Sequence, residues 1–134
     1  MGMTSSTWNS EACGPLRGAG VDAERIARFA RPNASPNPLP MVFTEREAAH
    51  AAACGDPARA LCAAFCVKEA LFKAAGRPVD VRACEVFARP GQQRPEVVIG
   101  EGLAADLGGA AIEVRLFEDG GNLIAAVVLT GEGA

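Results

Sequence analysis

Aromatic side chains are scarce in this chain of 134 residues: they make up 5% of it, and tyrosine is absent. No basic segment is interleaved with aromatic residues, and the formal net charge is −3 at pH 7. Nucleic-acid-binding domains usually combine a positive surface with aromatic platforms on which bases stack. We therefore expect no nucleic-acid partner.

Long hydrophobic runs are also absent. No stretch approaches the ~20 apolar residues that a membrane-spanning helix requires. The first residues do not have the charged-then-apolar order of a signal peptide. We therefore expect no membrane partner and a cytoplasmic location.

The chain has little that resembles a thiol or histidine site. Its five cysteines are an odd number without Cys-x-x-Cys spacing, which disfavours a disulfide framework and a zinc ribbon, so reduced thiols are expected. Cys62 and Cys66, one helical turn apart, either share a soft metal ion or are buried as small apolar residues, which is the commoner role. The only histidine, His50, follows Glu45 and Glu47 and is interpreted as a solvated surface residue. No Ser–His or Cys–His catalytic pair is predicted.

Polar and proline-rich segments indicate the limits of the ordered domain. Residues 1–14 (MGMTSSTWNSEACG) are polar without periodicity and are interpreted as a disordered leader. Residues 31–40 (RPNASPNPLP) contain too many prolines for a helix or a central strand and are expected to form a loop. Residues 15–134 are predicted to form one domain, long enough to bury a modest core without disulfides.

The first half of the domain is predicted to be mainly helical. A short strand over residues 16–21 is expected to end at Asp22, and residues 24–31 have the spacing of a helix. Thr44, three residues before Glu47, has the capping-box pattern that begins a second helix.

A longer helix follows, and after it the chain changes character. Asp56 is the expected N-cap, Pro57 occupies the first helical position, and Gly76 ends the helix. A hairpin is predicted from residues 81–88 and 95–100, and a short helix over residues 101–108. A second hairpin, around the turn DGGN, is predicted from residues 112–118 and 122–131. The fold class is therefore α+β, with one long helix packed on a mostly antiparallel sheet.

The long helix carries charges beside its apolar stripe. In FCVKEALFKAAG (residues 65–76), Lys68 falls in the middle of the stripe, and Glu69 and Lys73 lie one turn apart at its border. The other members of the stripe are Leu61, Phe65 and Phe72. One interpretation is that Lys68 extends to the surface while Glu69 and Lys73 form an exposed pair.

Another interpretation is a binding site. Asp22 and Glu69, from separate elements, can converge on Mg²⁺, which takes one or two carboxylates together with phosphate oxygens and water. Lys68 and Lys73 would supply positive charge for the same phosphates. The set suits a magnesium–polyphosphate ligand, although any strand-end aspartate and Lys-Glu helix would match this spacing.

Two segments carry a resemblance to a known family. GVDAERIARF and FCVKEALFKAAG resemble the Gly-x-Asp strand and the Phe/Trp-x-x-Lys-Glu-Ala/Ser-x-x-Lys helix of the 4′-phosphopantetheinyl transferases, in particular the short holo-acyl-carrier-protein synthase type. FTEREAA, VRACEV, RPEVVIG and AAVVL extend the resemblance over about residues 18–129.

The resemblance implies an activity and roles for individual residues. Members of the family transfer the phosphopantetheine arm of coenzyme A to a serine of a carrier protein and release adenosine 3′,5′-bisphosphate. By resemblance, Asp22 and Glu69 bind Mg²⁺ with Glu24 as a possible third ligand, and Lys68 and Lys73 lie against the coenzyme A phosphates. Glu69 would deprotonate the serine, directly or through a metal-bound water, and Lys73 would stabilise or protonate the leaving phosphate.

The resemblance also implies partners. Arg25, Arg28 and Arg31, spaced at three, would form a basic face on the first helix that suits an acidic carrier-protein helix, although a solvated arginine face is the alternative. Short members of the family commonly form trimers with sites between subunits, so a homotrimer is expected.

Two positions depart from the family pattern. Glu118 stands about where the family has the histidine of Ser-x-Ser-His, and a carboxylate there would repel a phosphate unless a metal or an arginine intervenes. Ala64 replaces the arginine usual in the long helix. Three hypotheses stay open: an active transferase with altered coenzyme A contacts, which we favour; a non-catalytic homologue that binds a carrier protein or coenzyme A; and an unrelated structural domain.

Overall fold

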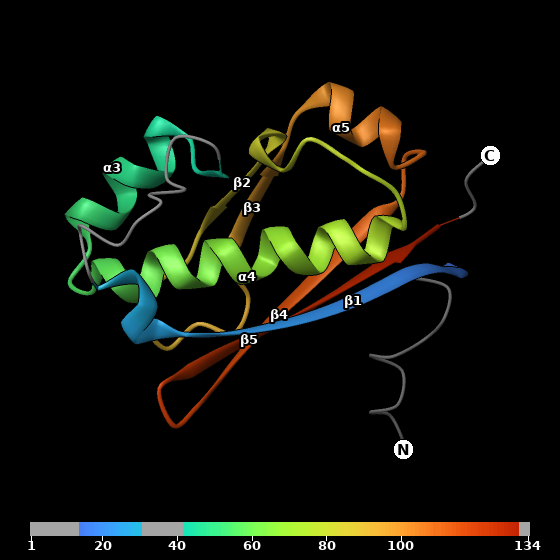
Figure 1. The fold of residues 1–134 in the computed structure, drawn as a ribbon. Helices are drawn as coiled ribbons and strands as arrows, with labels where there is room; N and C mark the ends of the chain where they lie inside the picture. The colour runs from blue at the N-terminus through green and yellow to red at the C-terminus, as the bar shows by residue number, and fades with distance from the viewer. Residues whose placement is uncertain (1–13, 31–41, 132–134) are drawn as a thin grey trace, which may run out of the picture.

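A single long helix, α4 (Pro57–Ala75), runs through the middle of the structure (Figure 1). This computed structural model describes residues 14–30 and 42–131, so the predicted leader up to residue 13 and the whole predicted proline-rich loop lie outside the described residues. The caps of α4 are those predicted: the Asp56 side chain accepts a hydrogen bond from Arg59 N at 3.2 Å, and Gly76 ends the helix with φ of 71°.

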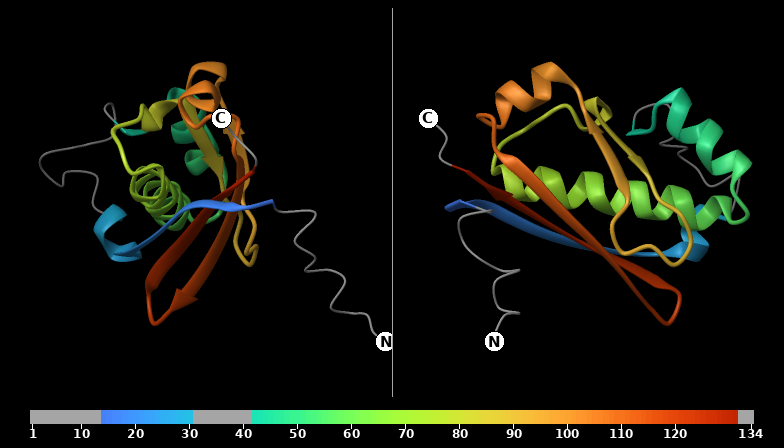
Figure 2. Two further views of the ribbon diagram at one scale, coloured as in Figure 1. Left: turned by 90° about the vertical axis from the view of Figure 1, so that its right-hand side faces the viewer. Right: turned by 180° about the vertical axis from the view of Figure 1, so that it is seen from behind.

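A three-stranded antiparallel sheet packs against α4. Its strand order is β1 (Leu16–Arg25), β5 (Asn122–Thr130), β4 (Ala111–Asp119), so β5 is central. The predicted hairpin of β4 and β5 is confirmed, and Gly120 and Gly121 supply the positive φ angles of its turn. Figure 2 shows α4 on one face of this sheet, and no other described helix covers the opposite face.

The remaining elements enclose α4 from another side. They are α3 (Glu45–Ala53), the short 3₁₀ helix η3 (Val81–Ala83), the antiparallel hairpin of β2 (Cys84–Phe87) and β3 (Glu96–Ile99), and α5 (Glu101–Asp106). The predicted α+β class, the second helix, the first hairpin and the short helix are thus confirmed. None of the described helices is long and apolar enough to cross a membrane.

Glycine lets β1 lie directly on the backbone of α4. A Cβ atom on Gly20 would clash with the Ala70 carbonyl oxygen and lie 2.8 Å from Ala74 N. One added on Gly18 would clash with the Ala74 carbonyl oxygen. Only glycine permits this approach, which brings the backbone of β1 next to the second half of α4.

The predicted helix over residues 24–31 is wrong. The strand continues through Asp22 to Arg25, which pairs with Asn122 of β5, and only the 3₁₀ helix η2 (Ile26–Phe29) follows. Ile26 N donates to Gly121 O at 2.9 Å. Pairing with a distant strand therefore overrides the local helical spacing, and Asp22 lies within β1 rather than at its end.

The apolar stripe predicted on α4 is also partly wrong. Leu61 and Phe65 are half-buried and Phe72 is 43% exposed, whereas the buried residues are mainly small. They are Ala60, Cys62, Ala63, Ala64, Cys66, Val67, Lys68, Ala70, Leu71 and Ala74. Because strands approach α4 from two sides, small side chains fill the narrow space between the backbones.

His50 is not the solvated residue that was predicted. It is half-buried, its Nε2 lies 2.8 Å from Ala88 O, and its ring packs edge-on against Phe87 with centroids 5.5 Å apart. Its contacts attach α3 to the end of β2.

Candidate active site

The structure brings Asp22 and Lys73 together. Lys73 Nζ donates to Asp22 Oδ1 at 3.1 Å and to Val21 O at 3.0 Å. The Lys73 side chain is 52% exposed and that of Asp22 only 12%. An ammonium has three N–H donors, so these two contacts leave one donor for a ligand at the surface.

Asp22 has an oxygen that the protein leaves unpaired. Its Oδ2 is buried and has no hydrogen-bond partner among the described residues. A buried carboxylate oxygen without a partner is costly, and a hard cation would satisfy it. Asp22 therefore fits the Mg²⁺ that the sequence predicts at this position.

Glu69 lies on the part of α4 that faces Asp22. Gly20 of β1 approaches Ala70 and Lys73, and Cys62 Sγ contacts Glu24 O at 3.7 Å. Two strand residues advance about 6.7 Å and four helical residues about 6 Å, so each step of two residues along β1 matches about one turn of α4 in length. Asp22, midway between Gly20 and Glu24, is thus opposite the turn that carries Glu69.

Glu69 itself is half-buried and free of ion pairs within the part of the chain that the structure describes. It is one helical turn before Lys73, on the same face. Among the described residues no three His, Cys, Asp or Glu side chains form a cluster that would hold a metal by themselves. Asp22 and Glu69 would therefore hold Mg²⁺ together with ligand phosphate oxygens and water, the arrangement that Mg²⁺ usually adopts.

Glu24 is engaged elsewhere. Its Oε1 accepts from Arg28 Nη1 at 2.7 Å, and the Arg28 guanidinium also lies over the rings of Phe29 and Phe65, 5.6 and 5.1 Å from their centroids. A role of Glu24 as third metal ligand would require it to release Arg28.

The basic helical face predicted for a carrier protein is not formed in the way expected. Arg25 lies in β1 and Arg28 in η2, and Arg31 is outside the described residues. Arg25 and Arg28 are both exposed, but they do not share one α-helical face.

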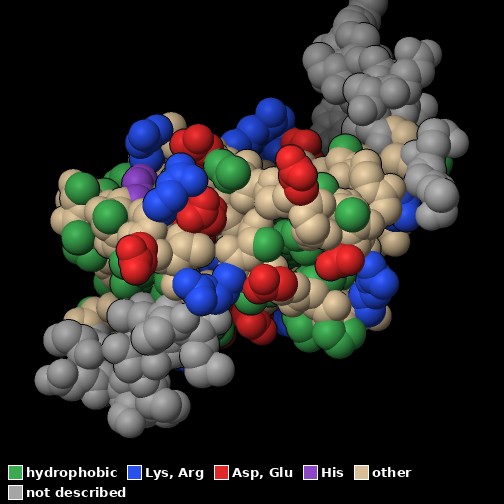
Figure 3. Space-filling model, turned by 90° about the horizontal axis from the view of Figure 1, so that it is seen from above, with side chains coloured by type: hydrophobic (Ala, Val, Ile, Leu, Met, Phe, Trp, Pro, Cys, Tyr) green, Lys and Arg blue, Asp and Glu red, His purple; other side chains and the backbone are tan. Residues whose placement is uncertain are grey.

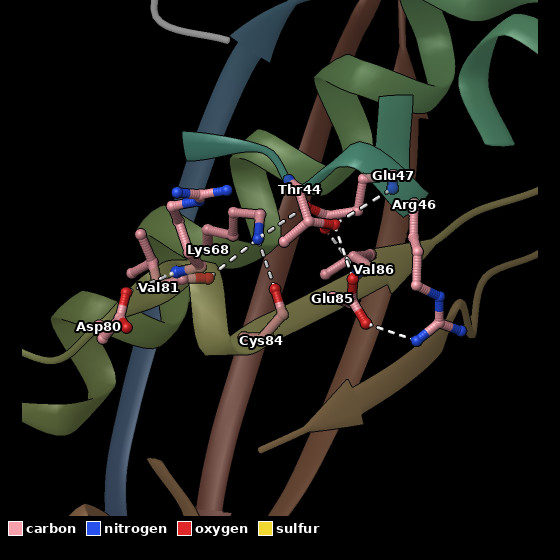
Figure 4. Close-up of polar contacts among 10 residues, drawn as sticks. Thr44, Arg46, Glu47, Lys68, Asp80, Val81, Cys84, Glu85 and Val86 are labelled. Atoms are coloured by element: carbon pink, nitrogen blue, oxygen red, sulfur yellow. Dashed lines mark hydrogen bonds and ion pairs between the residues drawn. The ribbon is translucent and has the colours of Figure 1, made fainter. Parts of the chain in front are cut away.

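Lys68 is inside the protein (Figure 4). Its side chain is 0% exposed, and Nζ lies 3.1 Å from Glu47 Oε1 and donates to Val81 O at 2.9 Å and to Cys84 O. These three contacts use all the N–H donors of the ammonium. The prediction that Lys68 lies against coenzyme A phosphates is not supported, because no part of its side chain reaches the surface.

Glu47 is the partner that the sequence did not reveal. Besides Lys68, its carboxylate accepts from Thr44 N at 2.9 Å and from Val86 N at 2.7 Å. The capping box of α3 was predicted from Thr44 and Glu47, but the same carboxylate also reaches α4 and β2 (Figure 4). The only sequence signal for this pair is the lysine in the apolar stripe of α4, which calls for a buried anion as its partner.

Charged side chains elsewhere are mixed in sign. On the face seen in Figure 3, Lys and Arg alternate with Asp and Glu and form no extended area of one charge. At the β4 edge, Arg59 Nη1 contacts Glu118 Oε1, and Glu118 raises the pKa of Arg59 through this hydrogen bond. The arginine needed beside Glu118 is therefore present, although it comes from Arg59 rather than from position 64.

The chain matches the family model of the 4′-phosphopantetheinyl transferase superfamily over residues 18–127. It is 38% identical over 127 residues to the holo-[acyl-carrier-protein] synthase of Anaeromyxobacter dehalogenans, covering 88% of this chain and 98% of that protein. The chain belongs to this superfamily. The predictions of the family and of a transferase of the holo-[acyl-carrier-protein] synthase type are confirmed, and an unrelated structural domain is excluded.

Solved structures agree on the fold of the transferase. The holo-[acyl-carrier-protein] synthase of Neisseria meningitidis matches with a TM-score of 0.71 at 22% identity, covering 87% of this chain and 99% of that one. An ACPS–CoA complex from Chronobacterium ammoniagenes matches with a TM-score of 0.67 at 23% identity, covering 86% and 97%.

Three cysteines of the transferase, Cys62, Cys66 and Cys84, are buried in the core. Cys62 and Cys66 are buried, and the hydrogen bond to Cys62 together with burial raises the pKa of the Cys66 thiol. Burial also raises the pKa of Cys84 to about 11. Cys62 and Cys66 are both 0% exposed and pack in the core, so they act as the small apolar residues of the commoner alternative.

Proposed function

We propose that the protein transfers the 4′-phosphopantetheine arm of coenzyme A to a serine of an acyl carrier protein, with Mg²⁺ held by Asp22 and Glu69. The observation that carries this proposal is the meeting of Asp22, with its unpaired Oδ2, and Lys73 beside the turn that carries Glu69. Family membership and the coenzyme A complex of a structurally similar protein support the same ligand.

Each group has a defined task in the proposed reaction. The serine hydroxyl attacks the phosphorus that bears the pantetheine arm, and its proton passes to the Glu69 carboxylate. The bond from that phosphorus to the bridging oxygen breaks, and adenosine 3′,5′-bisphosphate leaves. Lys73 donates its free N–H to the oxygen on which charge develops. Mg²⁺, when bound, neutralises the pyrophosphate charge.

Asp22 positions Lys73 in this scheme. The contacts to Asp22 Oδ1 and Val21 O fix the ammonium at the surface of β1, so it does not need to be ordered when the ligand arrives. Lys68 has no role in the scheme, because it is fully buried.

A homotrimer is proposed as well, supported by the uncovered face of the three-stranded sheet. Val21 is 58% exposed and Phe117 45% exposed on this face, and their neighbours in register are Ala126 and Ile124 of β5. A contiguous apolar area is typical of a protein interface. The Asp22–Lys73 pair lies at the β1 edge of the sheet and the Arg59–Glu118 pair at the β4 edge, so the two pairs are at different edges within one subunit. Val21→Asp is expected to yield monomers in multi-angle light scattering.

A cytoplasmic location is proposed because the cysteines that the structure describes are all free thiols. Arg25 and Arg28 are proposed to contact the carrier protein, because they are exposed cations that closely follow Asp22 in the chain.

Intact mass spectrometry of several apo carrier proteins, incubated with the enzyme, coenzyme A and Mg²⁺, tests the proposed activity. A gain equal to one phosphopantetheine arm that disappears with EDTA and with Asp22→Ala supports it. Binding of a carrier protein or of coenzyme A without any gain in mass would instead identify a non-catalytic homologue.

A further inference from the structure

A pocket of about 250 Å³ lies between α4, the segment that joins β2 to β3, and β4. Its lining includes the polar residues Arg59, Arg89, Gln92, Gln93 and Glu118, and the apolar part is formed by Ala63, Ala88, Gly91, Leu116, Phe117 and Leu123. Guanidinium and amide donors next to an apolar surface suit a ligand that has both phosphate groups and a flat ring.

One of the two arginines is already occupied. Arg59 Nη1 contacts Glu118 Oε1, and its Nε lies 3.5 Å from Asp56 Oδ2. Arg89 forms no ion pair with any residue that the structure describes. The pocket therefore offers one available guanidinium and one that is paired with an acid of the protein itself.

A ligand can replace Glu118 as the partner of Arg59. The side chains of Arg59 and Glu118 are 26% and 38% exposed, and ion pairs at such positions are weak because water solvates both partners. A phosphate binds a guanidinium through two charge-assisted hydrogen bonds. An incoming phosphate can thus displace Glu118 from Arg59, but it enters against the negative charge of that carboxylate.

We propose that Arg59 binds a phosphate at the nucleotide end of coenzyme A and that Glu118 is an internal competitor that weakens this binding. The inference rests on the proposed function for the identity of the ligand. Ala64 offers no charge, so Arg59 is the cation that α4 presents to the pocket, and the carboxylate beside it sets the affinity.

Titration calorimetry with adenosine 3′,5′-bisphosphate tests the inference without a carrier protein. Glu118→Gln is expected to tighten binding roughly two- to fivefold, the range for loss of a half-exposed ion pair. Arg59→Met should weaken binding, and Glu118→Gln should give a smaller gain in the Arg59→Met background. Adenosine, which has no phosphate, should bind both single variants as it binds the wild type. Glu101→Gln, with the same change of charge on exposed α5, is the matched control and should not change affinity.

Two results would overturn the inference: an affinity unchanged by Glu118→Gln, or an equal gain with adenosine. Transfer of the arm by the wild type in the mass assay, together with either result, would leave the proposed function intact. Absence of both transfer and nucleotide binding in the wild type would refute the proposed function together with the inference. Circular dichroism melts of each variant show whether it is folded before its affinity is compared.

Discussion

Replacing Lys68 by methionine tests whether this lysine belongs to the interior of the protein. Methionine has a similar length and retains most of the packing, so the change removes chiefly the charge and three polar contacts. Glu47 keeps its hydrogen bonds from Thr44 N and Val86 N but becomes a buried anion without a cation. Removing one partner of a buried ion pair costs about 3–5 kcal/mol in free energy of unfolding.

The reciprocal change removes the other partner of the same buried ion pair. Glu47→Gln leaves the Lys68 ammonium buried without an anion, because its remaining acceptors are the neutral carbonyls of Val81, Cys84 and the new amide, so a similar loss is expected. In the double variant no unpaired charge remains. Its loss should be smaller than the sum of the two single losses by about 1–3 kcal/mol, the range for residues in direct contact.

Urea unfolding measures these losses, and a thermal melt should show the midpoint of Lys68→Met lowered by roughly 10–20 °C. Arg46→Ala is the control. It removes an ion pair to Glu85 of 2.9 Å in which Arg46 is 68% exposed, so a loss below about 1 kcal/mol is expected. A Lys68→Met protein of unchanged stability that no longer transfers phosphopantetheine would refute the structural role and return Lys68 to the ligand site.

Three further predictions concern other parts of the enzyme. Gly20→Ala should lower the free energy of unfolding by about 1–3 kcal/mol in urea, because the methyl group forces β1 away from α4, whereas Gly55→Ala, with nothing within 4 Å, should not. Glu69→Gln should reduce the rate of transfer at least roughly 100-fold in the mass assay at an unchanged melting temperature, and full activity would exclude Glu69 as the base. Burial raises the pKa of Cys84 from 9.0 to about 11, so above pH 9 the unfolded thiol ionises first and stability should fall up to about pH 11, by about 2–3 kcal/mol. Urea titrations of Cys84→Ala should lack this part of the alkaline loss.

Local signals explain what the sequence predicted well. The caps of α4 at Asp56 and Gly76 and the Gly120–Gly121 turn lie next to the elements that they delimit, so each can be recognised without a tertiary structure. The extension of β1 to Arg25 depends instead on pairing with Asn122, at the far end of the chain. The helical spacing of residues 24–31 contains no information about pairing with Asn122.

Some residues of the candidate site were likewise predicted from local sequence, whereas others were recognised only in the structure. Asp22, Glu69 and Lys73 were predicted from a motif, and the structure brings Asp22 and Lys73 into contact. Arg59 of α4 was not predicted, since its contact with Glu118 of β4 joins residues that are far apart in the sequence. The buried pair of Glu47 and Lys68 was missed because the capping box already accounts for a glutamate at position 47. Its second partner, Lys68, lies on another helix.

The angular spacing of the Lys-Glu-Ala-x-x-Lys motif explains why its two lysines have different roles. Five residues on an α-helix correspond to a rotation of about 140°, so Lys68 and Lys73 cannot point toward the same ligand. Lys73 and Glu69 are one turn apart and share the face toward β1, whereas Lys68 points to Glu47. The contacts of Lys68 hold α3, η3 and β2 against α4, while β1 lies on the opposite side through Gly20. Lys68 therefore lies in the apolar face because it ties α4 to α3, η3 and β2. These contacts are on the side of α4 away from β1, where Glu69 and Lys73 face the candidate active site.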